Sequence, residues 1–197
     1  MKSFLLLIGA VALTAGCSTS RFSASYVLDP KPPRVTSGDL KPVANPQPVS
    51  LVFDMHTAQG PFPEGTRKHG PEIASIIEDS RLFSSVARVG SENIARLQIT
   101  LTEMAAATGS DIRSLPPALT SSLAGAEAAL IFQFNASYQP AGKEPVRKVY
   151  QHAIHVLSSD GWKLRKELPM TAGQATGAML EQLTLSFLRD LQREGKL

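Results

Sequence analysis

The sequence predicts an α+β fold, in which a mixed or antiparallel sheet of about five to six strands has two main helices packed on one face. Three observations lead to this prediction. Residues Ala95–Met104 alternate apolar and polar side chains, as a half-buried strand does. Three further strand patterns follow between Ala128 and Leu168. Helical patterns begin at Pro71 and again near Gln174, so the two helices are separated by strands.

The first 16 residues have the pattern of a secretory signal peptide. Lys2 supplies a positive charge, and Phe4–Leu13 is a short apolar run. Such a run cannot span a bilayer as a helix, which needs about 20 apolar residues. We therefore expect residues 1–16 to be removed. Because Lys2 leaves with them, the formal net charge of +3 falls by one to +2.

The residues Leu13-Thr14-Ala15-Gly16-Cys17 resemble the lipobox of bacterial lipoproteins. In that family a diacylglycerol is attached to the cysteine thiol, a peptidase cuts before the cysteine, and the new amine is acylated. The resemblance implies that Cys17 holds the chain on a membrane, since several acyl chains give stable anchoring. Ser18 implies the periplasmic face of the outer membrane. The alternative is an ordinary signal peptide cut near Ala15, with Cys17 left as a free thiol.

Composition excludes several classes of protein. Cys17 is the only cysteine, so the fold has no internal disulfide and must be held by its core. The 20 basic residues barely exceed the 17 acidic ones, whereas a nucleic-acid-binding domain normally has a clustered basic stripe. We expect no nucleic-acid partner, and no cofactor apart from the lipid on Cys17.

Residues 17–48 are predicted to form a proline-rich tether between the lipid and a globular domain at 49–197. Proline removes backbone donors and disfavours helix in the residue before it. An extended segment of this length could reach about 90 Å, at roughly 3 Å per residue. The alternative is that Tyr26-Val27-Leu28 packs back on the domain as an edge strand. The domain is long enough to bury an adequate core without disulfides.

The domain is predicted to begin with a strand at Val49–Met55, whose alternate residues are apolar. A glycine- and proline-rich loop follows. A helix then begins at Pro71, because proline is favoured at the first helical position. The apolar face of this helix consists of Ile73, Ile76 and Ile77, and a short strand follows at Val86–Val89.

The second half of the domain begins with the strand Ala95–Met104, which points Leu97, Ile99 and Leu101 to one side. A small helix is expected at Ala118–Leu123. The next three strands form a meander, in which a tight turn at Asp160-Gly161 precedes the last one. These strands are Ala128–Tyr138, Val146–Leu157 and Trp162–Leu168.

The last predicted helix runs from about Gln174 to Glu194, and Gly195 ends it. A broad apolar stripe marks the face that this helix buries. The stripe is made of Leu180, Leu183, Phe187, Leu188 and Leu191.

The element order resembles small periplasmic lipoprotein domains that assist envelope machines. Examples are the lipopolysaccharide-assembly plug lipoprotein, the auxiliary lipoproteins of lipid ABC transporters and the TolB amino-terminal-like domain. The matching stretches are Ile76–Val86, Ala95–Glu103 and the helix that ends in Leu183–Leu191. The resemblance implies a helper role in the envelope and identifies no functional residue beyond the lipobox.

The chain contains no sequence motif of a known catalytic site. It lacks G-x-S-x-G, the P-loop, G-x-G-x-x-G and H-E-x-x-H. A strand would send His152 and His155 to opposite faces, so we expect no metal site and interpret both as surface or sheet-face polar residues. The remaining histidines are His56 and His69, of which His69 directly follows Arg67 and Lys68. We therefore expect no enzymatic activity, with an envelope hydrolase as the least favoured alternative.

Two basic groups are the candidate interaction residues. The first lies on neighbouring strands of the meander and could bind lipid phosphates, lipopolysaccharide or an acidic partner; it comprises Arg147, Lys148, Lys163, Arg165 and Lys166. The second, Arg67 and Lys68, is expected in the loop before the first helix, where Phe62 is either an exposed contact or a plug in the core. The alternative for the meander group is a solvated sheet face.

Three functions remain open from the sequence. The first is a non-enzymatic accessory or assembly subunit of a cell-envelope complex, which would bind another envelope protein. The second is a lipid- or lipopolysaccharide-binding module of a transport system. The third is the hydrolase. Oligomeric state is not predicted.

Overall fold

The computed structural model describes residues 25–28, 34–88, 94–108, 126–157 and 170–197. The elements in these ranges are β1 (Ser25–Leu28), a 3-10 turn η1 (Ser37–Asp39), β2 (Val49–Thr57), β3 (Gly60–Pro61), α1 (Pro63–Asp79), β4 (Val86–Ala87), β5 (Ala95–Thr108), β6 (Ala126–Gln139), β7 (Val146–Leu157) and α3 (Ala172–Arg193). Several predicted features lie outside the described residues: the signal peptide, Cys17, the helix Ala118–Leu123, and the turn and strand from Asp160 to Leu168. No helix of the described part is long and apolar enough to cross a membrane.

The described strands form one sheet in the order β1-β7-β6-β5-β2-β3, and β4 also pairs with β2. Strands β5, β6 and β7 are an antiparallel meander. The predicted meander contained β6, β7 and the strand Trp162–Leu168, which lies outside the described residues, so the pairing of β5 with β6 is a finding of the structure. Strand β2 runs parallel to β5, from Val49 opposite Ala95 to His56 opposite Thr102. A parallel neighbour needs a crossover connection, and α1 supplies it. The sheet is therefore mixed, which confirms the predicted fold class.

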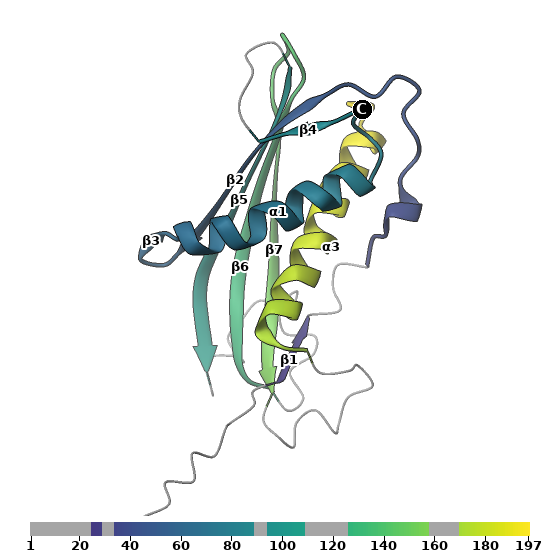
Figure 1. Ribbon diagram of the computed structural model, residues 1–197. Helices are drawn as coiled ribbons and strands as arrows, with labels where there is room; N and C mark the ends of the chain where they lie inside the picture. Colours follow the sequence, from purple (N-terminus) through teal and green to yellow (C-terminus); the bar gives the residue numbers. More distant parts are fainter. Residues whose placement is uncertain (1–24, 29–33, 89–93, 109–125, 158–169) are drawn as a thin grey trace, which may run out of the picture.

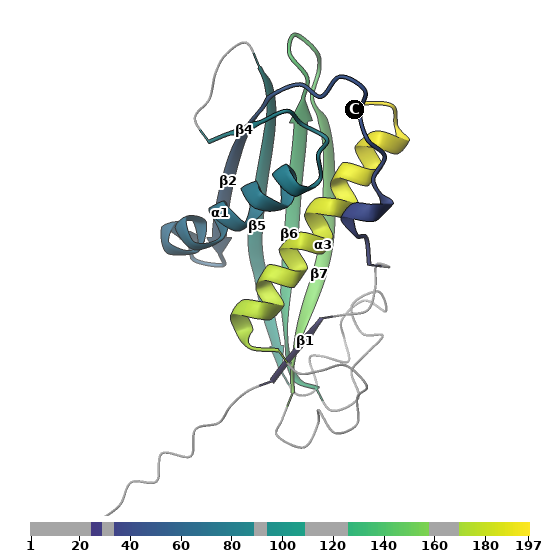
Figure 2. The same ribbon diagram turned by 45° about the vertical axis from the view of Figure 1, so that its right-hand side comes forward.

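Both helices cover the same face of this sheet, and the core lies between them and the strands (Figures 1 and 2). Leu97, Ile99 and Leu101 point into this core and are 0% exposed. Phe134 on β6 and Phe187 on α3 are equally buried. Each such side chain contributes about 1.5–3 kcal/mol of burial free energy. The predicted apolar faces of β2, β5 and α3 are all confirmed.

Helix α1 begins earlier than the sequence predicted. It starts at Pro63, and Pro71 lies inside it. Both prolines are compatible with the first helical position, and the prediction chose Pro71 and placed Pro63 in the preceding loop. An interior proline costs about 3 kcal/mol through its missing hydrogen bond. The burial of Ile73 and Ile77 on one side of the same helix offsets this cost.

Helix α3 begins at Ala172, two residues before the predicted start near Gln174, and a capping box marks its beginning. Thr171 is the N-cap: its hydroxyl oxygen accepts a hydrogen bond from Gln174 N–H at 3.3 Å, and the Gln174 side chain accepts one from Thr171 N–H at 2.9 Å. The helix ends before Gly195, whose φ of +65° favours glycine. Nearly its whole circumference is buried between Met179 and Leu188, so something besides the sheet must cover it.

Helix α1 and the segment before β2 provide that cover, and the position of this segment corrects the prediction of an extended tether. Strand β1 pairs antiparallel with β7, so the alternative for Tyr26–Leu28 is confirmed. Val35 and Leu40 belong to the main core and are 2% and 8% exposed. The prolines hid any apolar period in this segment, yet it forms β1 and η1 and buries isolated apolar side chains in the core. The described part of residues 17–48 thus lies on the domain.

Candidate interaction surfaces

The alternation of β7 separates two residues that the sequence analysis had grouped. Arg147 and Lys148 are neighbours in a strand, so their side chains leave opposite faces of the sheet. Lys148 Nζ donates to the Glu194 carboxylate at the end of α3, and this hydrogen bond raises the pKa of Lys148. Arg147 is exposed on the face that no described helix covers. The other members of the group, Lys163, Arg165 and Lys166, lie outside the described residues.

We call the helix-free side of β5, β6 and β7 the outer face. The pairing register places its side chains in rows across the strands, of which Gln98–Ser137–Arg147 and Thr100–Asn135–Val149 are two. Besides these residues, the outer face includes Arg96, Thr102, Gln133, Gln139 and Gln151. Most of these named side chains are polar without charge, and all of the named ones are exposed or half-buried. Farther along the same side of β6 and β7, Ile131, Ala153 and His155 are buried and do not belong to this exposed surface.

The outer face can form many hydrogen bonds but holds no set of residues for acid–base or nucleophilic chemistry. Amides and hydroxyls both donate and accept hydrogen bonds. One such bond already runs along β6, from Gln133 Nε2 to Asn135 Oδ1 at 3.1 Å. Val149 stands among these groups with 62% of its surface exposed. Beside it, a shallow hollow of about 330 Å³ has Arg96 and Arg147 in its lining.

Arg96 was missed by the sequence analysis, although alternation alone places it on the same side of β5 as Gln98. What the sequence does not contain is the strand order. Because β6 joins β5 to β7, Arg96 and Arg147 reach the same hollow from strands far apart in the chain.

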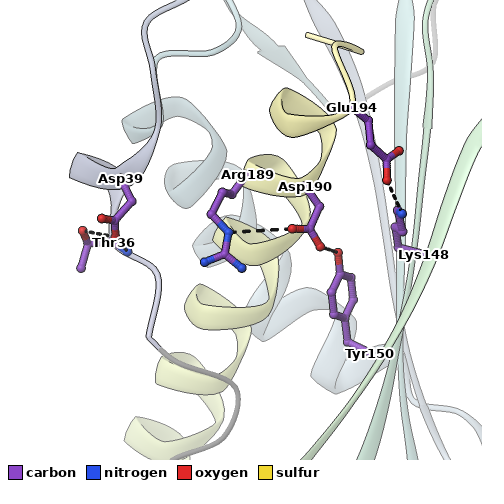
Figure 3. Close-up of polar contacts among 7 residues, drawn as sticks. All are labelled: Thr36, Asp39, Lys148, Tyr150, Arg189, Asp190 and Glu194. Carbon is purple, nitrogen blue, oxygen red and sulfur yellow. Dashed lines mark hydrogen bonds and ion pairs between the residues drawn. The ribbon is translucent and has the colours of Figure 1, made fainter.

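A hydrogen-bonded network connects the other face of β7 to α3 (Figure 3). The Tyr150 hydroxyl donates to Asp190 Oδ2 at 2.8 Å, and Arg189 Nε lies 3.8 Å from Asp190 Oδ1. Burial raises the pKa of Tyr150, and its hydrogen bond to Asp190 raises it further. Together with the Lys148–Glu194 ion pair, these contacts fix the register of α3 on the sheet.

The second predicted basic group lies on a helix and not in a loop. Arg67 and Lys68 are both exposed in the first half of α1. Arg67 borders a depression beside β2 that Arg88 also lines. Phe62 is the N-cap of α1 and packs partly buried against the core. Its amide donates to the Met55 carbonyl at 2.7 Å, which holds the start of the helix against β2.

The histidines differ from expectation in their burial. His152 and His155 do leave opposite faces of β7, but both are 0% exposed, so neither is a surface residue. His69 is also buried, and its Nδ1 lies 2.6 Å from Glu72 Oε2 one turn along α1. Within the part of the chain that the structure describes, no group of three or more His, Cys, Asp or Glu side chains could hold a metal ion.

Comparison with known proteins gives similarities of fold only. No family model matches the sequence, and no curated protein is similar to it. Rare lipoprotein B from Shewanella oneidensis is 14% identical, with a TM-score of 0.35 over 75% of this chain and 92% of the other. A minor lipoprotein from Acinetobacter baumannii is 9% identical, with a TM-score of 0.39 over 75% of this chain and 94% of the other. A PelC dodecamer subunit from Paraburkholderia phytofirmans is 12% identical, with a TM-score of 0.35 over 84% of this chain and 98% of the other.

Proposed function

We propose that this chain is a lipid-anchored, non-enzymatic accessory protein of the bacterial cell envelope that binds another envelope protein through its outer face. The observation that carries the proposal is the surface of that face. Three long strands present uncharged hydrogen-bonding side chains around the exposed Val149, with Arg96 and Arg147 at one end. No helix of the described chain covers it (Figure 2).

Such a surface matches what a protein interface needs. Protein interfaces are depleted in charged side chains at their centre, enriched in arginine and crossed by about ten direct hydrogen bonds. The amides of Gln98, Gln133 and Asn135 can be desolvated at low cost, provided that a partner supplies hydrogen bonds in place of water. Covering Val149 would remove apolar surface from water, which is favourable.

The anchor is the second part of the proposal. It rests on the resemblance of Leu13–Cys17 to a lipobox, and Ser18 after the cysteine supports a location on the outer membrane. The first described strand, β1, starts at Ser25, and seven residues, 18–24, lie between it and Cys17 in the sequence. Seven residues span at most about 25 Å. The domain would therefore stay near the membrane surface, because this distance is much shorter than the reach predicted for an extended tether of residues 17–48.

Photo-crosslinking in the native host tests the outer face. A photoreactive residue at position 149 of the full chain should give a discrete crosslinked product with one envelope protein. The same residue at position 75 on the exposed side of α1 should not. Equal crosslinking from both positions, or none from position 149, would contradict the proposed interface.

A substitution pair supplies a matched control. Asn135→Arg puts a bulky charge in the middle of the outer face and should reduce co-purification of the partner at least tenfold. Ser75→Arg adds the same charge on α1 and should leave co-purification unchanged. Both variants should melt within about 2 °C of the wild type, since both positions are at the surface. Full co-purification with Asn135→Arg would refute the role of this face.

The alternative function is a lipid- or lipopolysaccharide-binding module, which the arginines at the edge of the outer face also support. Native mass spectrometry of the purified chain distinguishes the two. A retained lipid or lipopolysaccharide that is lost in Arg96→Gln/Arg147→Gln, together with no crosslinked protein at position 149, would favour the alternative.

A further inference from the structure

A second basic surface lies on the helix side of the molecule, away from the outer face. A hollow of about 440 Å³ opens between η1 and the last turns of α3. We call it the basic hollow, and its lining consists of Arg34, Asp39, Lys41, Arg189, Gln192 and Arg193. None of its cationic residues was singled out by the sequence, because 34–41 and α3 are brought together only by tertiary packing.

The two walls of the basic hollow are held together by specific contacts. Lys41 N–H donates to Gln192 Oε1 at 2.9 Å, and Gln192 Nε2 donates back to the Lys41 carbonyl at 2.5 Å. Val35 and Leu40 are buried in the core on either side of η1. Because residues 34–41 are tied to α3 in this way, Arg34 and Lys41 are kept beside the helix.

The charges of the basic hollow do not balance. Four cationic side chains face one carboxylate, so the lining has a net charge of +3 (four minus one). The single carboxylate, Asp39, accepts hydrogen bonds from Thr36 N–H at 2.8 Å and the Thr36 hydroxyl at 2.9 Å. The backbone hydrogen bond is the main cause that lowers the pKa of Asp39. Asp39 keeps its negative charge, which offsets one of the four cations and interacts with the nearby Arg189 (Figure 3).

Three of the four cations of the basic hollow have no ion-pair partner in the part of the chain that the structure describes. Among the described residues, no carboxylate lies within ion-pair distance of Arg34, Lys41 or Arg193. Arg189 has Asp190 beside it at 3.8 Å, but Asp190 already accepts the Tyr150 hydroxyl (Figure 3). Arg189 Nε is buried and makes no hydrogen bond. The Arg189 side chain is 24% exposed, and an anion in the hollow could accept hydrogen bonds from guanidinium N–H groups other than Nε.

We propose that the basic hollow binds a phosphate group, from either an anionic lipid headgroup or a free phosphoester. Guanidinium groups match phosphate oxygens in geometry and charge, and arginine is preferred where a phosphate is bound through paired hydrogen bonds. Arg189 and Arg193 are four residues apart on one face of α3, where like charges repel unless an anion lies between them. The site is independent of the outer face, so its failure would leave the proposed protein interface intact.

Vesicle flotation tests the proposal with residues 17–197 carrying Cys17→Ala, a chain that has neither the lipid anchor nor the apolar run Phe4–Leu13. The probes are phosphatidylcholine vesicles with and without phosphatidylglycerol, and pyrophosphate in calorimetric titration. We expect the chain to bind one of the two phosphate probes. Arg34→Gln/Arg193→Gln should weaken that binding at least tenfold, whereas Arg96→Gln/Arg147→Gln, which removes the same charge from the outer face, should change it less than twofold.

Each outcome decides the question. Binding to phosphatidylglycerol vesicles but not to pyrophosphate assigns the site to a lipid headgroup, and the reverse assigns it to a free phosphoester. Equal weakening by both double variants would show diffuse attraction and overturn the proposal. The basic residues could instead serve only to oppose the negative end of the α3 dipole. In that case Arg34→Gln/Arg193→Gln would lower the melting temperature without weakening binding, which also overturns it.

Discussion

The substitution Tyr150→Phe tests the contact by which α3 is held on β7. The hydroxyl donates to Asp190 at 2.8 Å, and the ring packs edge-on against Phe134 with centroids 6.1 Å apart. Phenylalanine keeps the ring and its packing. The substitution therefore removes one hydrogen bond to a carboxylate and little else.

The expected loss can be worked out from the surroundings of Asp190. A hydrogen bond to a charged group contributes about 1.5–3 kcal/mol. The Asp190 side chain is 28% exposed, so water can replace part of the lost bond. We expect the free energy of unfolding to fall by about 1–2 kcal/mol. For a domain of this size, that corresponds to a drop in Tm of about 2–8 °C.

Urea and thermal unfolding of purified variants provide the assay, with Tyr138→Phe as the control. Tyr138 is also a buried tyrosine and packs against Phe83 at 5.9 Å, but its hydroxyl has no hydrogen-bond partner among the described residues. Its substitution should cost less than about 0.5 kcal/mol. Equal losses for the two variants, or no loss for Tyr150→Phe, would refute the role assigned to the Asp190 contact.

Three further predictions concern other parts of the chain. Leu183 is 0% exposed, so Leu183→Ala should open a cavity in the core and lower the free energy of unfolding in urea by about 2–5 kcal/mol. A loss below about 1 kcal/mol would contradict the burial of this side chain. Gly65→Ala places a methyl group 2.5 Å from Met55 Sδ and should lower the free energy of unfolding by about 1–3 kcal/mol. An unchanged free energy of unfolding would contradict the close contact between Gly65 and Met55. The raised pKa of Tyr150 adds stability that is complete below the ordinary value of 10.0 and is lost as the pH rises above it. Between pH 9 and pH 11, the free energy of unfolding should therefore fall less for Tyr150→Phe than for the wild type. Equal falls for the two proteins would contradict the assigned shift.

Much of the fold could be predicted because its strands have one buried face. Leu97, Ile99 and Leu101 alternate with polar residues, and this pattern specifies both a strand and the side that enters the core. The periodic stripe of α3 gives its type and its buried face in the same way. The start of α1 could not be predicted equally well, because Pro63 and Pro71 satisfy the same local rule and only packing against β2 distinguishes them.

The candidate surfaces were less predictable than the fold. Arg147 and Lys148 form one group in the sequence, but the alternation of β7 sends one to the outer face and binds the other to Glu194. Arg96 joins Arg147 only through the strand order. Residues 34–41 read as tether because proline suppresses local patterns, yet two buried side chains suffice to fix such a segment on a helix.

The sequence by itself determined the fold class, the faces of the long strands and the last helix, together with the expectation of a lipid on Cys17. These features are encoded locally, in the spacing of apolar side chains or in a short motif. The tertiary structure decided which strands are neighbours, where the amino-terminal segment lies and which basic residues share a surface. Such relations depend on contacts between residues far apart in the chain, as with Lys41 and Gln192, and no local pattern specifies them.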